Sequence, residues 1–181
     1  MGYDQTCFFS GHRVLPADPR LLPALEEAIR RASGAGCRRF LCGGALGFDT
    51  LAARTLLRLR EQENLRLCLV LPCRGQERAW SQADQETYRE ILRQADEWEF
   101  LQGDYTPGCM HRRNRVMASR SGRGIFLWDG RESGGTAYTF RFFRLLGKAR
   151  PIVWENLWPR RQRLAFSAGK PYNQDNTERE V

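Results

Sequence analysis

The sequence predicts one α/β domain with a doubly wound, mainly parallel sheet and helices on both faces. Short apolar segments alternate along the chain with longer segments of helical periodicity, and strands that are separated by helices pair in parallel. The apolar segments are almost continuous rather than alternating with polar residues, which is typical of strands buried on both faces. We assign this single domain to residues 1–158.

The first half of the chain opens with a short apolar strand that Ser10-Gly11 ends. Asp18-Pro19 then marks a helix start, because a carboxylate caps free amides and proline fits the first turn. Apolar residues recur at helical spacing as far as Gly34. The elements predicted in this half are strands at 6–9, 38–42 and 67–71 and helices at 19–34 and 49–63.

The second half repeats the alternation of helix and strand. The elements predicted here are helices at 79–95, 110–119 and 134–147 and strands at 97–101, 124–128 and 151–154. From Pro159 onward the chain is polar and loses its periodicity. We therefore expect residues 159–181 to form a flexible C-terminal tail.

Composition excludes several classes of protein. No run approaches the roughly 18 apolar residues of a membrane helix, and the N-terminus lacks the features of a signal peptide. The six cysteines form no C-x-x-C pair and only two histidines are present, which favours reduced thiols over disulfides or a zinc site. We expect a cytoplasmic protein without membrane contact or bound metal. Its formal net charge of +8 favours an anionic ligand.

Three predicted strands end in unusual turns, at the edge where open parallel sheets bind ligands. The candidate residues in these turns are Ser10, Gly11, His12, Arg13, Gly43, Gly44, Asp49, Asp129, Glu132, Gly134, Gly135 and Thr136. Glycine pairs let the backbone approach an oxyanion, and amides at the following helix start can donate to it. The alternative is that these glycines only allow tight turns. Because two pairs fall at equivalent strand ends, we favour phosphate binding, although neither turn is a Walker A or G-x-G-x-x-G loop.

Several turn residues allow two interpretations. Asp49 either caps its own helix or accepts hydrogen bonds from ribose hydroxyls. His12 either makes a local hydrogen bond or donates to a phosphate that Arg13 also binds. Asp129 and Glu132 are either solvated loop acids or acid–base groups beside a sugar.

One predicted helix is strongly basic. At helical spacing Arg112 and Arg115 share a face, with Arg113 and Asn114 turned elsewhere. The arginines form either a solvated surface or a clamp on a nucleotide phosphate or on nucleic acid. Trp80, in a polar stretch, either stacks on a base or packs against the sheet.

Five motifs occur in order along the chain. They are Ser-Gly-His-Arg (10–13), Gly-Gly-Ala-Leu-Gly-Phe-Asp (43–49), Leu-Pro-Cys-Arg-Gly-Gln (71–76), Arg-Asn-Arg-Val-Met (113–117) and Ser-Gly-Gly-Thr (133–136). Together they resemble the SLOG superfamily, and within it the YpsA-like branch of bacterial proteins, over roughly residues 5–155. The superfamily also includes the LOG phosphoribohydrolases and the DNA-processing protein DprA. The resemblance implies a Rossmann-like sheet whose glycine-rich turns bind nucleotide-derived ligands.

The resemblance also implies roles for individual residues. It places ligand-binding turns at Gly43, Gly44, Asp49, Gly134, Gly135 and Thr136, and polar pocket-lining segments at Arg13, Arg113, Asn114 and Arg115. The LOG enzymes carry a catalytic glutamate after the threonine of their Pro-Gly-Gly-x-Gly-Thr-x-x-Glu signature. The present sequence has no such glutamate after Thr136, which disfavours hydrolysis by that mechanism.

We therefore expect a protein that binds a phosphate-bearing nucleotide, such as NAD or ADP-ribose, as a sensor or regulatory module. The first alternative is a hydrolase of N-glycosidic bonds in nucleoside phosphates, with Glu132 or Asp129 as the acid–base group. The second alternative is single-stranded DNA binding of the DprA type through the basic segment 111–123. A homo-oligomer interface is also an open expectation, because the apolar residues of one helix exceed a single buried stripe. They are Phe140, Phe142, Phe143, Leu145 and Leu146.

Overall fold

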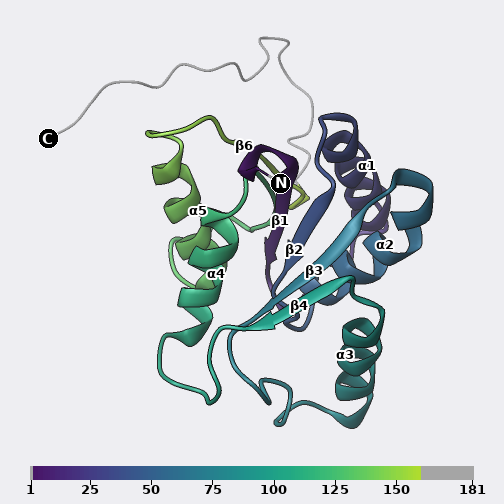
Figure 1. Cartoon of the computed structure of the whole chain (residues 1–181), viewed down its shortest axis with the longest axis vertical. Helices are drawn as coiled ribbons and strands as arrows, with labels where there is room; N and C mark the ends of the chain where they lie inside the picture. Colours follow the sequence, from purple (N-terminus) through teal and green to yellow (C-terminus); the bar gives the residue numbers. More distant parts are fainter. Residues whose placement is uncertain (1, 160–181) are drawn as a thin grey trace, which may run out of the picture.

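The computed structural model describes residues 2–159, which form one six-stranded, all-parallel sheet with helices on both faces (Figure 1). The strands are β1 (Thr6–Gly11), β2 (Arg39–Cys42), β3 (Arg66–Leu71), β4 (Glu97–Phe100), β5 (Arg123–Leu127) and β6 (Val153–Asn156). The helices are the short 3₁₀ turn η1 (Tyr3–Gln5), α1 (Leu21–Gly34), α2 (Phe48–Glu63), α3 (Gln82–Gln94), α4 (Cys109–Ser119) and α5 (Gly135–Leu146). The predicted α/β class is confirmed. Of the expected tail, residues 160–181 lie outside the described part.

The sheet reverses its winding direction beside β1. Its strand order is β4-β3-β2-β1-β5-β6, so the chain winds outward from β1 to β4 and then returns to place β5 on the other side of β1. In Figure 1, α1, α2 and α3 cover one face of the sheet and α4 and α5 cover the other. Neighbouring crossovers diverge above the carboxyl ends of β1 and β5, which opens a crevice at that edge of the sheet.

Each face of the sheet has its own hydrophobic core. Phe9 points into the core beneath α1, α2 and α3, whereas its neighbour Phe8 points into the core beneath α4 and α5, because successive strand residues face opposite sides. The Phe8 ring packs edge-to-face on Phe126, at 5.4 Å between centroids, and on Phe143 at 4.9 Å. Both faces of β1 are therefore covered, as its continuous apolar sequence predicts.

The apolar surplus of α5 is largely absorbed within the domain. Phe140 and Phe143 are buried, and Phe142 and Leu146 pack against the same core. Leu145 alone of the five residues is exposed, at 59%. Packing of α5 between sheet and α4 thus accounts for most of the residues that suggested an oligomer interface.

Element boundaries differ from the predicted ones where local chemistry sets them. Helix α3 begins at Gln82 rather than near Ala79, because the Ser81 hydroxyl oxygen accepts a hydrogen bond from the Asp84 amide at 3.2 Å and caps the helix. Strand β6 begins at Val153 rather than Pro151, and proline has no N–H for the ladder. No helix in residues 2–159 is long and apolar enough to cross a membrane.

Candidate functional site

The crevice at the winding reversal holds a pocket of about 370 Å³. The segments that follow β1 and β2 line it, together with α4 and the start of α5. Its lining residues are Phe9, Ser10, Gly11, His12, Arg13, Ala45, Asp49, Met110, His111, Arg113, Asn114, Met117, Gly135 and Thr136. Most of the predicted ligand-binding residues therefore lie together, but Gly43, Gly44, Arg115 and Gly134 are outside this lining.

The start of α5 presents free backbone amides to the pocket. Gly134, with φ of 97°, turns the chain into the helix without a side-chain cap. Within residues 2–159 the amides of Gly135 and Thr136 have no hydrogen-bond partner, and the first turn carries no acidic residue. Unpaired N–H groups and the helix dipole make this end of α5 suited to an anion.

The other glycine turn is filled by the protein's own groups. The Ala45 amide donates to Asp49 Oδ2 at 3.2 Å, and the Phe48 amide donates to the His12 carbonyl at 3.0 Å. Asp49 therefore binds the turn that precedes α2 and does not cap the free amides of that helix, whose start has no side-chain cap. Gly44 lies away from the pocket, close to Gln76, whose side-chain amide donates to the Gly44 carbonyl at 3.2 Å.

A buried arginine forms the floor of the pocket. Arg113 is only 5% exposed, and its Nη1 lies 3.6 Å from Asp49 Oδ2. Neither Nε nor Nη1 of Arg113 has a hydrogen-bond partner in the described residues. A Cβ atom at Gly43 would lie 1.4 Å from Nη1, so this glycine leaves the space that the guanidinium occupies.

Burial and neighbouring charge shift the pKa of Asp49 in opposite directions. Desolvation raises the pKa of this carboxyl group, and the positive charge of Arg113 and the amides of the turn partly offset that rise. The pocket floor is thus a closely packed pair of opposite charges with unused guanidinium donors.

Asn114 connects α4 to the start of α5. Its side-chain amide donates to Thr139 Oγ1 at 2.8 Å, and the Thr139 hydroxyl donates to the Gly135 carbonyl at 2.7 Å. This chain of hydrogen bonds fixes the position of the helix start relative to Arg113. Arg13 lines the same pocket as an exposed side chain.

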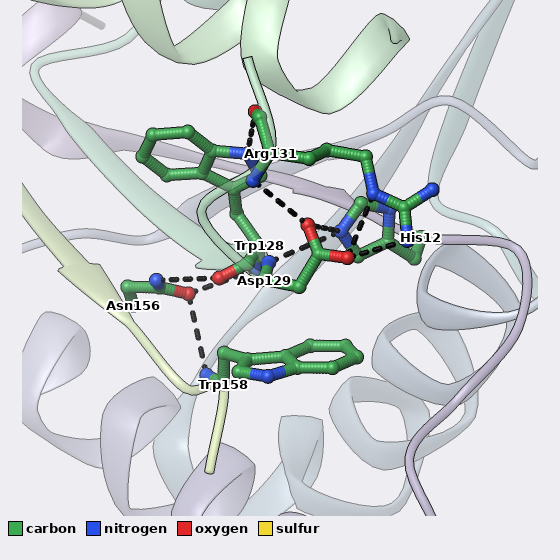
Figure 2. A network of polar contacts seen from close by, with 6 residues as sticks. All are labelled: His12, Trp128, Asp129, Arg131, Asn156 and Trp158. Atoms are coloured by element: carbon green, nitrogen blue, oxygen red, sulfur yellow. Dashed lines mark hydrogen bonds and ion pairs between the residues drawn. The ribbon is translucent and has the colours of Figure 1, made fainter. Parts of the chain in front are cut away.

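His12 joins the turn after β1 to the turn after β5 (Figure 2). Its Nε2 accepts a hydrogen bond from the Asp129 amide at 3.1 Å and lies 3.0 Å from Asp129 Oδ1. Arg131 Nε donates to Asp129 Oδ2 at 2.7 Å, and hydrogen bonds from Arg131 are the main reason that the pKa of Asp129 falls to about 2. The Trp158 ring packs edge-to-face on His12 at 5.4 Å. His12 therefore makes a structural hydrogen bond, but to a turn far away in the sequence, and it also lines the pocket.

A comparison with known protein families gives a match over most of the described chain. The family model for YpsA, described as the YspA SLOG family, matches residues 18–146. The chain belongs to the YpsA SLOG family. This membership confirms the resemblance that the five motifs indicate.

Relatives of this YpsA-family chain include proteins from Bacillus. It is 27% identical over 134 residues to the uncharacterized SPbeta prophage-derived protein YoqJ of Bacillus subtilis, a match that covers 67% of this chain and 77% of YoqJ. It is 30% identical over 118 residues to a UPF0398 protein of Bacillus velezensis, covering 64% of this chain and 65% of the relative. It is 26% identical over 132 residues to the UPF0398 protein YpsA of Bacillus subtilis, covering 69% and 73%.

A solved structure with a similar fold is DNA processing protein A from Helicobacter pylori, which was studied for its single-stranded DNA binding mode. The two structures align with a TM-score of 0.59 at 19% identity, over 89% of this chain and 68% of that chain. At this identity the likeness concerns the fold alone.

The remaining candidate site residues of this YpsA-family protein, Asp129, Glu132 and Trp80, are not in the pocket lining. Asp129 is engaged by Arg131 and His12, and Glu132 is exposed, with its backbone carbonyl accepting a hydrogen bond from Arg141. Trp80 packs edge-to-face on Tyr88 at 5.6 Å. This contact corresponds to the packing interpretation of Trp80.

Five lining residues were not among the predicted ligand contacts. They are Phe9, Ala45, Met110, His111 and Met117. The two methionines share the inner face of α4 with Arg113 and Asn114, because positions 110, 113, 114 and 117 follow helical spacing. That spacing is a signal in the sequence from which this face could have been assigned to the pocket.

Proposed function

We propose that this protein binds a phosphate-bearing nucleotide, such as NAD, ADP-ribose or a related molecule, in the pocket at the winding reversal, and serves as a sensor or regulatory module. The observation that carries this proposal is the guanidinium of Arg113, which is buried at the pocket floor with two nitrogen atoms that lack acceptors. Unpaired buried donors cost free energy. Phosphate oxygens would satisfy them, since arginine donates to phosphate in a fork geometry.

The surroundings of Arg113 favour the same ligand chemistry. The free amides of Gly135 and Thr136 and the exposed guanidinium of Arg13 line the pocket with Arg113. Donors at a helix start and two arginines suit an oxyanion better than a neutral sugar. The pocket volume of about 370 Å³ lies in the range of small-molecule sites, roughly 300–1,000 Å³.

A binding module fits the geometry better than an N-glycosidic-bond hydrolase. The two carboxylates proposed for that chemistry, Asp129 and Glu132, are absent from the pocket lining. Asp129 is committed to hydrogen bonds with Arg131, so it is not available as a base. The carboxylate that does line the pocket, Asp49, accepts a hydrogen bond from the turn before its own helix.

Single-stranded nucleic acid is a second candidate ligand. The observation that favours it is a row of exposed arginines, with Arg112 and Arg115 on α4 and Arg120 directly after its end. Binding of this kind would bring counterion release and a steep dependence on salt. Fluorescence anisotropy with a labelled 20-nucleotide oligomer at two salt concentrations measures it directly.

The nucleotide proposal is tested by calorimetry and thermal unfolding with AMP, ADP-ribose and NAD, using adenosine as the phosphate-free control. A ligand at 100 times its Kd adds about 2.7 kcal/mol to the free energy of unfolding. For a chain of this size that corresponds to a rise in Tm of roughly 5–10 °C. Adenosine should give a much smaller shift. Equal shifts with adenosine and AMP, or no shift with any of the phosphate-bearing ligands, would refute phosphate recognition.

Two variants of Arg113 separate the effect of its charge from that of its donor geometry. Arg113→Lys keeps the positive charge beside Asp49 but loses the planar pair of N–H donors, and Arg113→Gln loses both the charge and this geometry. We expect AMP affinity to fall at least tenfold in each variant, because a charged arginine–phosphate contact contributes about 1.5–3 kcal/mol. Arg89→Gln, an exposed arginine on α3, is the matched control and should leave affinity unchanged. Retention of AMP affinity in folded Arg113→Lys would contradict the assignment.

A further inference from the structure

A second hollow, about 690 Å³, runs beside α4 on the side away from the sheet strands. We call it the arginine groove, defined by His111, Arg112, Arg115, Arg120 and Tyr138. No acidic residue lines it, and α4 itself contains neither aspartate nor glutamate. The groove is therefore a concentrated positive surface in a recess large enough for half of a dinucleotide.

Two of the groove arginines have no acidic partner. In the described part of the chain no carboxylate forms an ion pair with Arg112 or Arg115. Arg115 lies over the Phe142 ring, 5.2 Å from its centroid, which holds the guanidinium against α5. Arg120 differs, because it pairs with Glu99. Arg112 donates to the neutral side chain of Gln102 at 3.4 Å, so Arg112 and Arg115 are the groove arginines whose charge no carboxylate of the described residues offsets.

The arginine groove adjoins the pocket at His111. This residue lines both hollows, and its ring meets Tyr138 edge-to-face at 4.4 Å. Helix α4 separates the two sites only by its own width: Arg113 and Asn114 face the pocket, whereas Arg112 and Arg115 face the groove. A ligand that leaves the pocket across His111 therefore enters the groove without crossing a ridge of acidic side chains.

We propose that the arginine groove is a second phosphate subsite for the ligand of the pocket, so that the ligand carries at least two phosphates or nucleotide units. The proposal rests on the proposed function, which places the first phosphate at Arg113 and the start of α5. The second phosphate would pair with Arg112 and Arg115. The rings of His111 and Tyr138 offer an aromatic surface to the base or sugar between them. The link between the units is a phosphodiester, because it leaves a sugar between two phosphates, whereas the two phosphates of a pyrophosphate share one oxygen and cannot lie on both sides of α4.

Calorimetry with three probes tests this proposal: AMP, ADP-ribose and the 5′-phosphorylated adenylate dinucleotide pApA. The groove variant is Arg112→Gln/Arg115→Gln, and Arg89→Gln/Arg93→Gln on exposed positions of α3 is a control with the same loss of charge. In the wild type, we expect pApA, which has a sugar between its phosphates, to bind tenfold or more tightly than AMP. The groove variant should lose that advantage and keep its affinity for AMP within twofold. The control should retain both, and a gain of affinity for ADP-ribose in place of pApA would contradict a subsite across α4.

The dependence of affinity on salt gives a second readout. For pApA, the slope of log K against log salt should flatten by about one for each arginine removed, with no change for AMP. Equal affinity for AMP and both longer probes would overturn the second subsite while leaving the proposed function intact. The second subsite would also be overturned if the groove variant lost as much affinity for AMP as for pApA. If a 20-nucleotide oligomer alone needs the groove, the groove serves nucleic acid and the dinucleotide proposal is wrong. If AMP itself does not bind, the proposed function and the second subsite are both wrong.

Discussion

At the scale of single residues, the pocket depends on a contact between a backbone and a guanidinium. Arg113 lies across Gly43, where any side chain would occupy the position of Nη1. The same arginine faces the carboxylate of Asp49 at 3.6 Å. The missing side chain of Gly43 therefore leaves the space that the guanidinium of Arg113 occupies.

The variant Gly43→Ala tests whether ligand binding needs the close approach of Arg113 to this glycine. The methyl group must displace Arg113, so we expect AMP affinity to fall at least tenfold. The free energy of unfolding should fall by about 1–3 kcal/mol, the usual range for overpacking. Calorimetry and urea unfolding measure the two effects. An alanine variant with unchanged affinity would show that the observed position of Arg113 is not required for binding.

At the scale of elements, two glycine turns with similar sequences perform different tasks. The turn into α2 is closed by its own carboxylate, because Asp49 accepts from the Ala45 amide. The turn into α5 has no acid in the first helical turn and no side-chain cap, so the amides of Gly135 and Thr136 stay free. Under the proposed function, the start of α5 therefore supplies the backbone donors for the anion, and α4 supplies the guanidinium of Arg113.

Gly134→Ala tests the contribution of the α5 start. With φ of 97°, an alanine there is strained by about 1–3 kcal/mol, and relief of the strain would move the free amides. We expect lower stability in thermal unfolding and weaker AMP binding. Gly103→Ala is the control, because a Cβ there meets nothing within 4 Å and its φ is ordinary. Its effect should stay within about 0.5 kcal/mol. Equal thermal stability and equal AMP affinity of the two variants would argue against a role for the turn at Gly134.

At the scale of the whole molecule, the two hydrophobic cores are parts of one folding unit because they share every central strand. Phe8 and Phe9 occupy consecutive positions of β1 and belong to opposite cores. Loss of packing on one face therefore weakens the strands that support the other face. The pocket depends on both faces, since α2 contributes Asp49 from one side and α4 contributes Arg113 from the other.

Phe143→Ala should show this coupling. Removal of a fully buried phenylalanine costs about 3–5 kcal/mol, and urea unfolding should remain a single transition that circular dichroism and tryptophan fluorescence report at the same midpoint. Leu145→Ala, two positions along α5 and 59% exposed, should change stability little. Separate midpoints for the two probes would instead show that the two faces unfold independently.

Local patterns in the sequence determined a large part of this molecule. Apolar runs and helical periodicity predict the alternation of strands and helices, and helical spacing separates the face of α4 that carries Arg112 and Arg115 from the one that carries Arg113 and Asn114. These features follow from residues a few positions apart, whose geometry is that of one helix or strand. The motifs also indicate the family.

Only the tertiary structure decided how the site is built. It placed the buried guanidinium of Arg113 over Gly43, and it brought His12 to Asp129 across 117 positions of the chain. It also showed that one glycine turn is filled and the other is free. Such contacts depend on strand order and on the way helices pack over the sheet, and periodicity carries no information about either because it describes each element alone.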